Sequence, residues 1–294
     1  MRISYFHPPM PWWAILKKTA IEIDDDNCLG LAAQLAFYGL MALFPALLFL
    51  VALLGYLPVE GVAPGLLAAL SRVAPRELTT IVREQLDQIA TGGQAGLLTI
   101  GILGALWSSS AGMVAIIDAL NRAYDVSEWR PWWKSRLTAI GLTVAVSIFI
   151  VLSFVLVLLG PGAANWVAHW VGLGPVVTLV WPFIRWPLMV ACVLVGVDLV
   201  YHFAPNRRVQ WTWVTPGALV AVALWIAASF GFKFYITSVT DYAATYGTIG
   251  GAIVTLLWFY VSGLTVLVGA ELNGTIEHAW VNPLAEAPPP LPPP

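Results

Sequence analysis

Two basic side chains that could bind an anion, Arg185 and Lys233, lie inside stretches of sequence that are otherwise free of charge. A charge carried into hydrocarbon costs about 2.5–3.5 kcal/mol on insertion scales, so such a residue marks a functional site by default. Arg185 stands between Pro182 and Pro187. Its planar fork of donors matches a phosphate group in a bidentate manner, but it would also suit carbonyl groups that the prolines free by bending the helix. We predict that Arg185 binds an anionic headgroup. The alternative is that it pairs with freed carbonyl groups or a buried carboxylate and only stabilises the bend in the helix.

Three further residues extend this predicted substrate site. Lys233 would reinforce Arg185 if the two lined one cavity, but its long stem also lets it reach outward to the membrane surface. Gln34 and Tyr38 are four residues apart and therefore share one face of a helix. They would add hydrogen bonds to a central cavity or pack in the core. The predicted substrate-binding set is Arg185, Lys233, Gln34 and Tyr38.

A second group of polar residues is predicted at the cytoplasmic ends of the helices. Two pairs, Asp118 with Arg122 and Asp198 with His202, are spaced four residues apart, which places each pair on one helix face. The simplest interpretation is a polar network that joins three helices, and proton coupling through Asp198 or Glu271 is the alternative. The group comprises Asp118, Asn121, Arg122, Asp198, His202, Glu271 and Asn273.

Motifs of well-known enzyme classes are missing from the chain. There is no GxxxxGK[ST] phosphate loop, HExxH zinc site, paired CxxC or GxSxG elbow, so we expect no enzyme, no ATP hydrolysis, no metal and no cofactor. The 4 histidines are too scattered for the ligand cluster that metal-dependent RNA hydrolysis needs. Cys28 and Cys192 predict no disulfide framework. The 14 basic residues are dispersed, which does not suit a nucleic-acid partner.

Long uncharged runs supply the elements that must carry these groups. Hydrophobic residues make up 59% of the chain and charged residues 10%, against about 25% charged in globular domains. About 20 apolar residues in a helix cross the hydrocarbon of a bilayer. We therefore predict an all-α integral membrane protein, a six-transmembrane-helix bundle over 29–276. The predicted spans are about 30–55, 94–117, 137–160, 176–201, 212–236 and 247–272.

The segments outside the spans set the predicted orientation. Lys and Arg favour the side of the N-terminus by nine to three, so the positive-inside rule places both termini in the cytoplasm. Residues 1–28 are predicted to form a cytoplasmic amphipathic segment, and residues 277–294 are predicted to form a Pro-rich cytoplasmic tail. Helical spacing of apolar residues in 59–91 predicts an amphipathic helical cap on the outer side, or alternatively a lid over a substrate entrance. Stripes of small residues would suit helix packing or a homo-oligomer interface.

Six short motifs occur in order along the chain. They are Leu35-Ala36-Phe37-Tyr38, Leu106-Trp107-Ser108-Ser109-Ser110, Ala119-Leu120-Asn121-Arg122-Ala123-Tyr124, Arg185-Trp186-Pro187, Tyr201-His202-Phe203-Ala204-Pro205-Asn206 and Gly269-Ala270-Glu271-Leu272-Asn273. Together they resemble the YihY/BrkB family of bacterial inner-membrane proteins over about 21–278. The chain departs from the pattern in 109–112, where relatives are expected to carry a basic residue. Because members have been labelled ribonucleases (often ribonuclease BN), virulence factors and transporters, the resemblance implies a six-helix inner-membrane protein more firmly than any activity.

Three functions remain open on the sequence alone. The leading hypothesis is a transport protein that moves an amphiphilic or anionic substrate, such as a lipid, along a polar cavity, with membrane lipids as its partners. Arg185 and Lys233 toward the outer half and the polar group at the inner end motivate it. The alternative is a non-transporting scaffold that recruits partners through its Trp- and Arg-rich loop and its Pro-rich tail. A ribonuclease or another intramembrane enzyme comes last, since no pair of nucleophile and base can be named.

Overall fold

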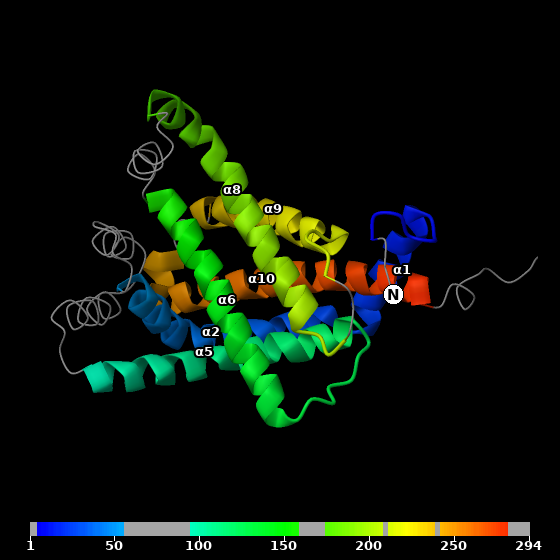
Figure 1. Cartoon of the computed structure of the whole chain (residues 1–294), viewed down its shortest axis with the longest axis horizontal. Helices are drawn as coiled ribbons and strands as arrows, with labels where there is room; N and C mark the ends of the chain where they lie inside the picture. The colour runs from blue at the N-terminus through cyan, green and yellow to red at the C-terminus, as the bar shows by residue number, and fades with distance from the viewer. Residues whose placement is uncertain (1–4, 56–94, 159–173, 208–210, 239–241, 282–294) are drawn as a thin grey trace, which may run out of the picture. The chain divides into compact units, whose positions relative to one another are not determined.

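The computed structural model describes residues 5–55, 95–158, 174–207, 211–238 and 242–281. Within these residues the regular secondary structure is entirely α-helical, which confirms that part of the prediction. The helices are α1 (Trp12–Asp25), α2 (Cys28–Gly55), α5 (Ala95–Ala123), α6 (Trp132–Leu158), α8 (Gly174–Phe203), α9 (Pro216–Ser238) and α10 (Tyr242–Val281) (Figure 1). The predicted outer cap at 59–91 and most of the Pro-rich tail lie outside the described residues.

Five of these helices contain a stretch long and apolar enough to cross a membrane. The stretches are Leu103–Ala123, Trp132–Ser153, Phe183–Phe203, Pro216–Tyr235 and Gly251–Val281. A shorter apolar stretch, Cys28–Leu43, lies within α2. The chain is therefore a helical membrane protein with several spans. The first predicted span, 30–55, is not among these five stretches and stays a prediction.

The helices belong to two compact units. The first unit holds Met1–Leu40, Ala115–Ser135 and Val197–Pro294, and the second holds Met41–Val114 and Arg136–Gly196. Helices α2, α5, α6 and α8 are divided between the units, while α9 and α10 belong wholly to the first. The predicted inner polar group therefore lies within the first unit, and Arg185 lies within the second.

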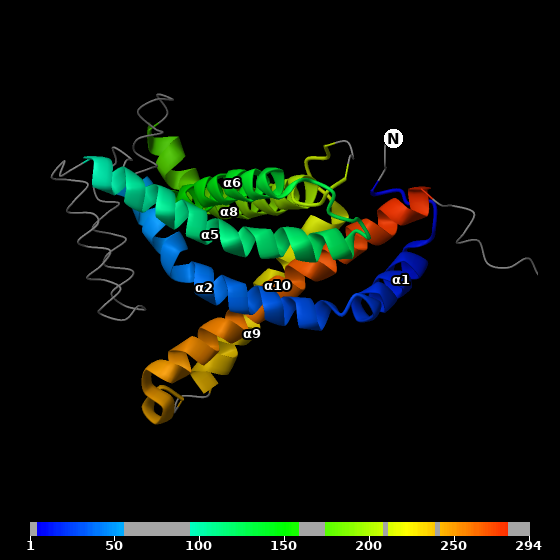
Figure 2. The same ribbon diagram turned by 90° about the horizontal axis from the view of Figure 1, so that it is seen from below.

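Helices α9 and α10 run side by side in the first unit (Figure 2). They touch backbone to backbone at Gly217 and Gly269: a Cβ atom on Gly217 would lie 2.0 Å from the Gly269 carbonyl oxygen, and one on Gly269 would lie 2.4 Å from the Gly217 carbonyl oxygen. Small residues allow this approach between membrane helices. Tyr201 of α8 donates its hydroxyl to the Val266 carbonyl of α10 at 2.5 Å. These contacts fix the start of α9 and the end of α8 against α10.

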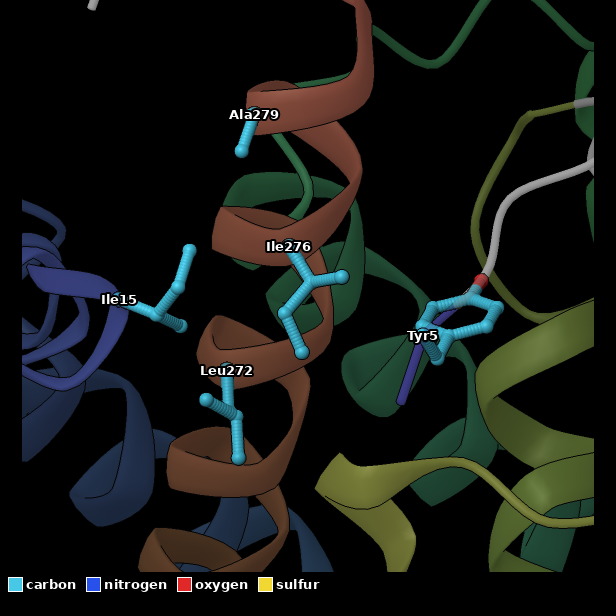
Figure 3. Close-up of a cluster of buried hydrophobic side chains, with 5 residues drawn as sticks. All are labelled: Tyr5, Ile15, Leu272, Ile276 and Ala279. Atoms are coloured by element: carbon cyan, nitrogen blue, oxygen red, sulfur yellow. The ribbon is translucent and has the colours of Figure 1, made fainter. Parts of the chain in front are cut away.

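A small apolar cluster fixes the N-terminal segment and α1 against the end of α10. Ile15 of α1 lies on one side of α10 and Tyr5 on the other, and both belong to a cluster with Leu272, Ile276 and Ala279 of α10 (Figure 3). Ile15 and Ile276 are fully shielded from solvent, and burying such a side chain stabilises the fold by about 1.5–3 kcal/mol. Within the segment predicted as 1–28, Tyr5 and α1 are therefore anchored on the last helix.

The chain leaves α5 through a Schellman motif. The Val126 N–H donates to the Asn121 carbonyl and the Asp125 N–H to the Arg122 carbonyl, both at 2.8 Å. Asp125 adopts φ 50°, the left-handed conformation that this motif requires and that Asp tolerates better than most residues. The motif ends α5 sharply and leaves the side chains of Asn121 and Tyr124 in the interior of the first unit, where both are buried.

Candidate functional site

The N-terminus of α9 is held by Asp198 of α8. Thr215 donates its backbone N–H and its hydroxyl to Asp198 Oδ1, at 3.2 and 2.6 Å. Thr215 also caps α9, since its Oγ1 accepts the Ala218 N–H at 3.2 Å, and Pro216 follows as the first helical residue, where its missing N–H does no harm. Asp198 is only 2% exposed. The positive end of the α9 dipole favours a carboxylate at this place.

Asn273 of α10 completes this contact with both ends of its amide. Its Oδ1 accepts the Gly217 N–H at 2.9 Å, and its Nδ2 donates to Thr215 Oγ1 at 2.9 Å and to the Tyr124 hydroxyl at 3.3 Å. Asn273 is completely buried, so losing any one of these partners would leave an unsatisfied group at a cost of about 1–3 kcal/mol. The side chains of Tyr124, Asp198, Thr215 and Asn273 are called the polar cage below.

Arg207, just beyond α8, packs against this cage and binds Glu277 of α10, which in turn binds Tyr5 of the N-terminal segment. Its guanidinium carbon lies 3.7 Å from the centroid of the Tyr124 ring, its Nη1 donates to Glu277 Oε2, and its Nη2 donates to the Tyr201 carbonyl at 3.0 Å. Tyr5 donates to the other oxygen of Glu277 at 2.5 Å. Burial raises the pKa of Tyr5 and that of Tyr124, against the nearby Arg207 charge, which lowers them. Both phenols are therefore neutral at physiological pH, Tyr5 as a donor to Glu277 and Tyr124 as an acceptor from Asn273.

A second contact ties the loop after α5 to the loop after α8. Asn121 Oδ1 accepts the Asn206 N–H at 2.8 Å, and Asn121 Nδ2 donates to Glu128 Oε2 at 3.0 Å. Arg130 donates through Nε and Nη2 to the two oxygens of Glu128 at 2.8 and 2.6 Å, and through Nη2 to the Ala204 carbonyl at 2.8 Å. This fork geometry orders both loops around Asn121.

Acidification is expected to weaken this loop contact through Glu128. Hydrogen bonds from the Arg130 side chain hold the pKa of Glu128 below its ordinary value of 4.5, more than desolvation raises it. A carboxyl whose pKa is lower in the folded chain stabilises the fold above its ordinary pKa and loses that contribution as the pH falls through the folded value. The melting temperature of the wild-type protein should therefore fall more steeply below pH 4.5 than that of Glu128→Gln. Equal slopes would show that Glu128 does not take part.

Glu271 of α10 lies in a separate contact with the start of α2. Cys28 donates its thiol to Glu271 Oε1 at 3.2 Å, and both side chains are buried. The Asp26 carboxyl lies within hydrogen-bonding reach of Glu271. Desolvation and the negative charge of Asp125 raise the pKa of Asp26. Glu271 thus joins α2 to α10, outside the polar cage.

The remaining predicted residues of the first unit lie at its surface or in aromatic contacts. Those with exposed side chains are Gln34, Tyr38, Asp118, Arg122 and Lys233. The His202 ring packs edge-on against Trp211, with 5.0 Å between the ring centroids. The structure therefore brings Asp198 and Asn273 together and places Asn121 in the adjoining loop contact. His202 and Glu271 belong to other contacts.

Arg185 lies in the second unit, in the first half of α8. Its guanidinium carbon is 5.4 Å from the centroid of the Trp186 ring. Its Nε is buried without a hydrogen-bond partner, and so is Nε1 of Trp181. Residues four apart share one helix face. Two unpaired donors, one of them on a charged group, therefore lie on one face of α8.

Arg136 shows how a second arginine of this unit is satisfied. Its Nη2 donates to the Trp107 carbonyl at 2.6 Å, and its guanidinium carbon lies 4.3 Å from the Trp107 ring centroid. Its Nε is unpaired like that of Arg185. Among the described residues, however, no hydrogen bond or ion pair joins the rest of the Arg185 guanidinium to the protein. Among the described residues, Arg185 thus keeps donor capacity for a ligand.

Metal-ligating side chains do not gather in the part of the chain that the structure describes. No group of three or more His, Cys, Asp or Glu residues there could hold a metal ion. Both cysteines are free, Cys28 buried and Cys192 partly buried. The groups available for chemistry among the described residues are therefore hydrogen-bond donors, buried carboxyl groups and ion pairs.

Comparison with known proteins identifies the family. The family model described as Virulence factor BrkB matches residues 19–291. The chain belongs to the BrkB family. The motifs that resemble YihY/BrkB proteins predict this family correctly, and the polar cage and Arg185 both fall within the matched residues.

Relatives of this BrkB-family chain carry two kinds of name. A Bacillus subtilis (strain 168) protein named ribonuclease-like, YfkH, is 37% identical over 83% of this chain and 88% of its own length. A UPF0761 membrane protein of Alkalilimnicola ehrlichii is 30% identical over 84% of this chain and 55% of its own length, and one of Ralstonia nicotianae is 28% identical over 90% and 60%. The chain thus spans little more than half of these two relatives. No solved structure matches it.

Several residues of the BrkB-family site are absent from the sequence-based prediction. Thr215 carries a usable signal, because Thr followed by Pro ahead of an apolar run is typical of a helix N-terminus. The sequence indicates Arg207 only as one of the basic residues on the cytoplasmic side, and it predicts Glu277 in the tail, whereas α10 continues to Val281. Their pairing joins residues 70 positions apart, which no local pattern reveals.

Proposed function

We propose that this BrkB-family protein moves an anionic amphiphile such as a phospholipid across the bacterial inner membrane, with both termini in the cytoplasm and without ATP hydrolysis of its own. The observation that carries the proposal is the pair of buried, unpaired donors on α8, Arg185 Nε and Trp181 Nε1. An unsatisfied buried donor costs about 1–3 kcal/mol, and more when it is charged. A phosphate headgroup between them would supply the missing acceptors and match the guanidinium in charge.

A purely structural role for Arg185 is less well supported. Pro187 has no N–H to offer the Phe183 carbonyl, so Arg185 would be expected to bond a freed carbonyl if it only stabilised the helix. Among the described residues it makes no such hydrogen bond, and α8 remains helical through both prolines. The donors are left for a ligand.

The surroundings of Arg185 favour an amphiphile over a small inorganic anion. The neighbouring side chains Phe183, Ile184, Trp186 and Leu188 are all exposed, Phe183 by 77%. In a bilayer such side chains contact acyl chains or another apolar surface. A phospholipid would place its phosphate at the two donors and its acyl chains along these side chains.

The site can be tested by photo-crosslinking in reconstituted vesicles. A photoreactive phosphatidylglycerol should label the peptide that contains Arg185 several-fold more than a photoreactive phosphatidylcholine. Arg185→Gln should lower the anionic labelling about tenfold, which corresponds to about 1.4 kcal/mol. Arg185→Lys keeps the charge without the fork and should fall between the two.

Arg136→Gln is the matched control, because the Arg136 guanidinium is bonded to the Trp107 carbonyl. It should leave labelling at Arg185 unchanged. Equal labelling by the anionic and zwitterionic lipids in the wild-type protein would contradict the proposed site.

A scaffold role is the second candidate, favoured by one observation. Trp129, Trp132 and Trp133 are 67%, 72% and 52% exposed, beside the ordered Arg130–Glu128 pair. Tryptophans at this place also anchor a protein at the membrane surface. Trp132→Ala with Trp133→Ala should leave lipid labelling at Arg185 intact. If this variant alone abolished the cellular function while Arg185→Gln preserved it, the scaffold would replace transport.

A further inference from the structure

We propose that Asp198 is a proton-binding site, in which its Oδ2 atom takes up and releases a proton while Oδ1 stays bound to Thr215. Asp198 is 2% exposed. Its Oδ2 is buried and is the one polar atom of the four cage side chains that has no hydrogen-bond partner. The inference concerns the first unit and uses none of the groups around Arg185.

Hydrogen-bond counting assigns the proton to Oδ2. A threonine hydroxyl has one donor and two acceptor positions. Thr215 Oγ1 accepts from the Ala218 N–H and from Asn273 Nδ2, so its own proton is left for Asp198 Oδ1. Oδ1 also accepts the Thr215 N–H. Because Oδ1 receives two donors, it acts only as an acceptor, and a proton on Asp198 must reside on Oδ2.

The amide and phenol donors that the structure pairs nearby are already committed. Asn273 uses its Oδ1 for the Gly217 N–H and both N–H positions for Thr215 and Tyr124. The Tyr201 hydroxyl, which is not part of the cage, donates to the Val266 carbonyl. Neither can turn to Oδ2 without breaking a bond that it now makes, and the Tyr124 hydroxyl makes no described hydrogen bond to Oδ2. The open position therefore belongs to something that comes from outside the cage.

A proton fits this position better than a metal cation. A hard cation such as Ca²⁺ requires about six to eight oxygen ligands and Mg²⁺ about six. Oδ2 is a single atom, and the described residues contain no cluster of metal-ligating side chains. A proton requires only the one oxygen.

Three titratable side chains, all of them phenols, interact electrostatically with Asp198. They are Tyr5 of the N-terminal segment, Tyr124 after α5 and Tyr201 of α8. The Arg207 cation beside the cage is bound to Glu277 of α10, and Glu271 of α10 is bound to Cys28. No described side chain therefore offers Asp198 a counter-charge by a direct ion pair, and the positive end of α9 is its main stabilising field.

Protonation at Oδ2 would act on the link between α8 and α9. A carboxylate at the N-terminus of α9 is attracted by the helix dipole and accepts charge-assisted hydrogen bonds from Thr215, whereas a neutral acid accepts weaker ones. Taking up a proton therefore loosens the contact between the two helices, and releasing it tightens the contact. The protonation itself does not depend on transport, although a role in driving or gating lipid movement rests on the proposed function.

Infrared spectroscopy of the full chain in nanodiscs tests the site. A pH titration of the wild-type protein should show the carbonyl band of a protonated buried carboxylic acid, and Asp198→Asn should abolish it. Thr215→Val should move the band to higher frequency, since a carbonyl that accepts fewer hydrogen bonds vibrates at higher frequency. Glu271→Gln, which alters another buried carboxyl outside the cage, should leave the band in place.

Two further measurements keep the inference open to refutation. Isotope-labelled aspartate in the wild-type protein should shift the band, which assigns it without a variant that fails to fold. Replacing choline with sodium as the cation of the buffer should not change the band. Any one of three results would overturn the inference. They are a band that persists in Asp198→Asn, a band that does not shift with labelled aspartate, and a band that disappears when sodium is added. None of these spectra measures transport, so the inference can fail while the proposed function stands, and the reverse.

Discussion

Gly217→Ala and Gly269→Ala are each expected to prevent stable assembly of the first unit. The new Cβ of Gly217→Ala would lie 2.0 Å from the Gly269 carbonyl oxygen and 2.5 Å from Cγ of Asn273. That of Gly269→Ala would lie 2.4 Å from the Gly217 carbonyl oxygen and 2.5 Å from the Tyr201 hydroxyl. Backbone atoms cannot give way as a flexible side chain can, so the expected cost is at or above about 3 kcal/mol, the upper end for overpacking.

Matched controls lie on the same two helices. Gly231 of α9 and Gly251 of α10 have nothing within 4 Å of an added Cβ, so Gly231→Ala and Gly251→Ala should be neutral or slightly stabilising because Ala is the better helix former. Size-exclusion chromatography in detergent and SDS-titration unfolding would compare the four variants. If all four behaved alike, the close crossing of α9 and α10 would be wrong.

Arg207→Met is expected to destabilise the protein by about 3–5 kcal/mol, the cost of leaving one partner of a buried ion pair uncompensated. The side chains of Arg207 and Glu277 are only 10% and 9% exposed. Arg207→Met would leave the Glu277 carboxylate with Tyr5 as its remaining hydrogen-bond donor. The free energy of unfolding, measured by SDS titration in mixed micelles, would report the loss.

Two comparisons separate this pair from an ordinary surface ion pair. Arg207→Met combined with Glu277→Gln should be more stable than Arg207→Met alone, since the double variant buries no unpaired charge. Arg130→Met, which breaks the more exposed pair with Glu128, should cost less than the buried pair, because exposed pairs contribute only about 0–1 kcal/mol. Additive costs in the double variant would show that Arg207 and Glu277 are not coupled.

The helical membrane architecture could be predicted because it depends on a signal that extends over a whole span. An uncharged run of more than 20 residues spans hydrocarbon as a helix, and every described helix after α1 overlaps such a run. The end of α10 could not be placed this way. Hydropathy ends the predicted span at 272, but α10 continues to Val281. Asn273 and Glu277 there are buried and bonded to other protein groups. A hydropathy scale scores such polar side chains as if they faced solvent, so it ends the span too early.

The candidate site could be predicted only where a polar residue stands out against apolar neighbours. Asp198, Asn273 and Arg185 are such residues. Thr215 and Gly217 do not stand out, because neither changes the hydropathy of the apolar run that forms α9, although Thr215 supplies the cap and Gly217 the close approach. Which polar residues meet depends on how α8, α9 and α10 pack, and spacing along one helix does not contain that information. The Asp198–Thr215 contact is an example.

The most direct test of the proposed function is the movement of a labelled anionic phospholipid across vesicles that contain the purified protein. The account predicts movement well above that of protein-free vesicles, a preference for the anionic over the zwitterionic lipid, and a loss of about tenfold in Arg185→Gln, equivalent to about 1.4 kcal/mol. A wild-type rate equal to that of protein-free vesicles, or an unchanged rate in Arg185→Gln, would contradict it.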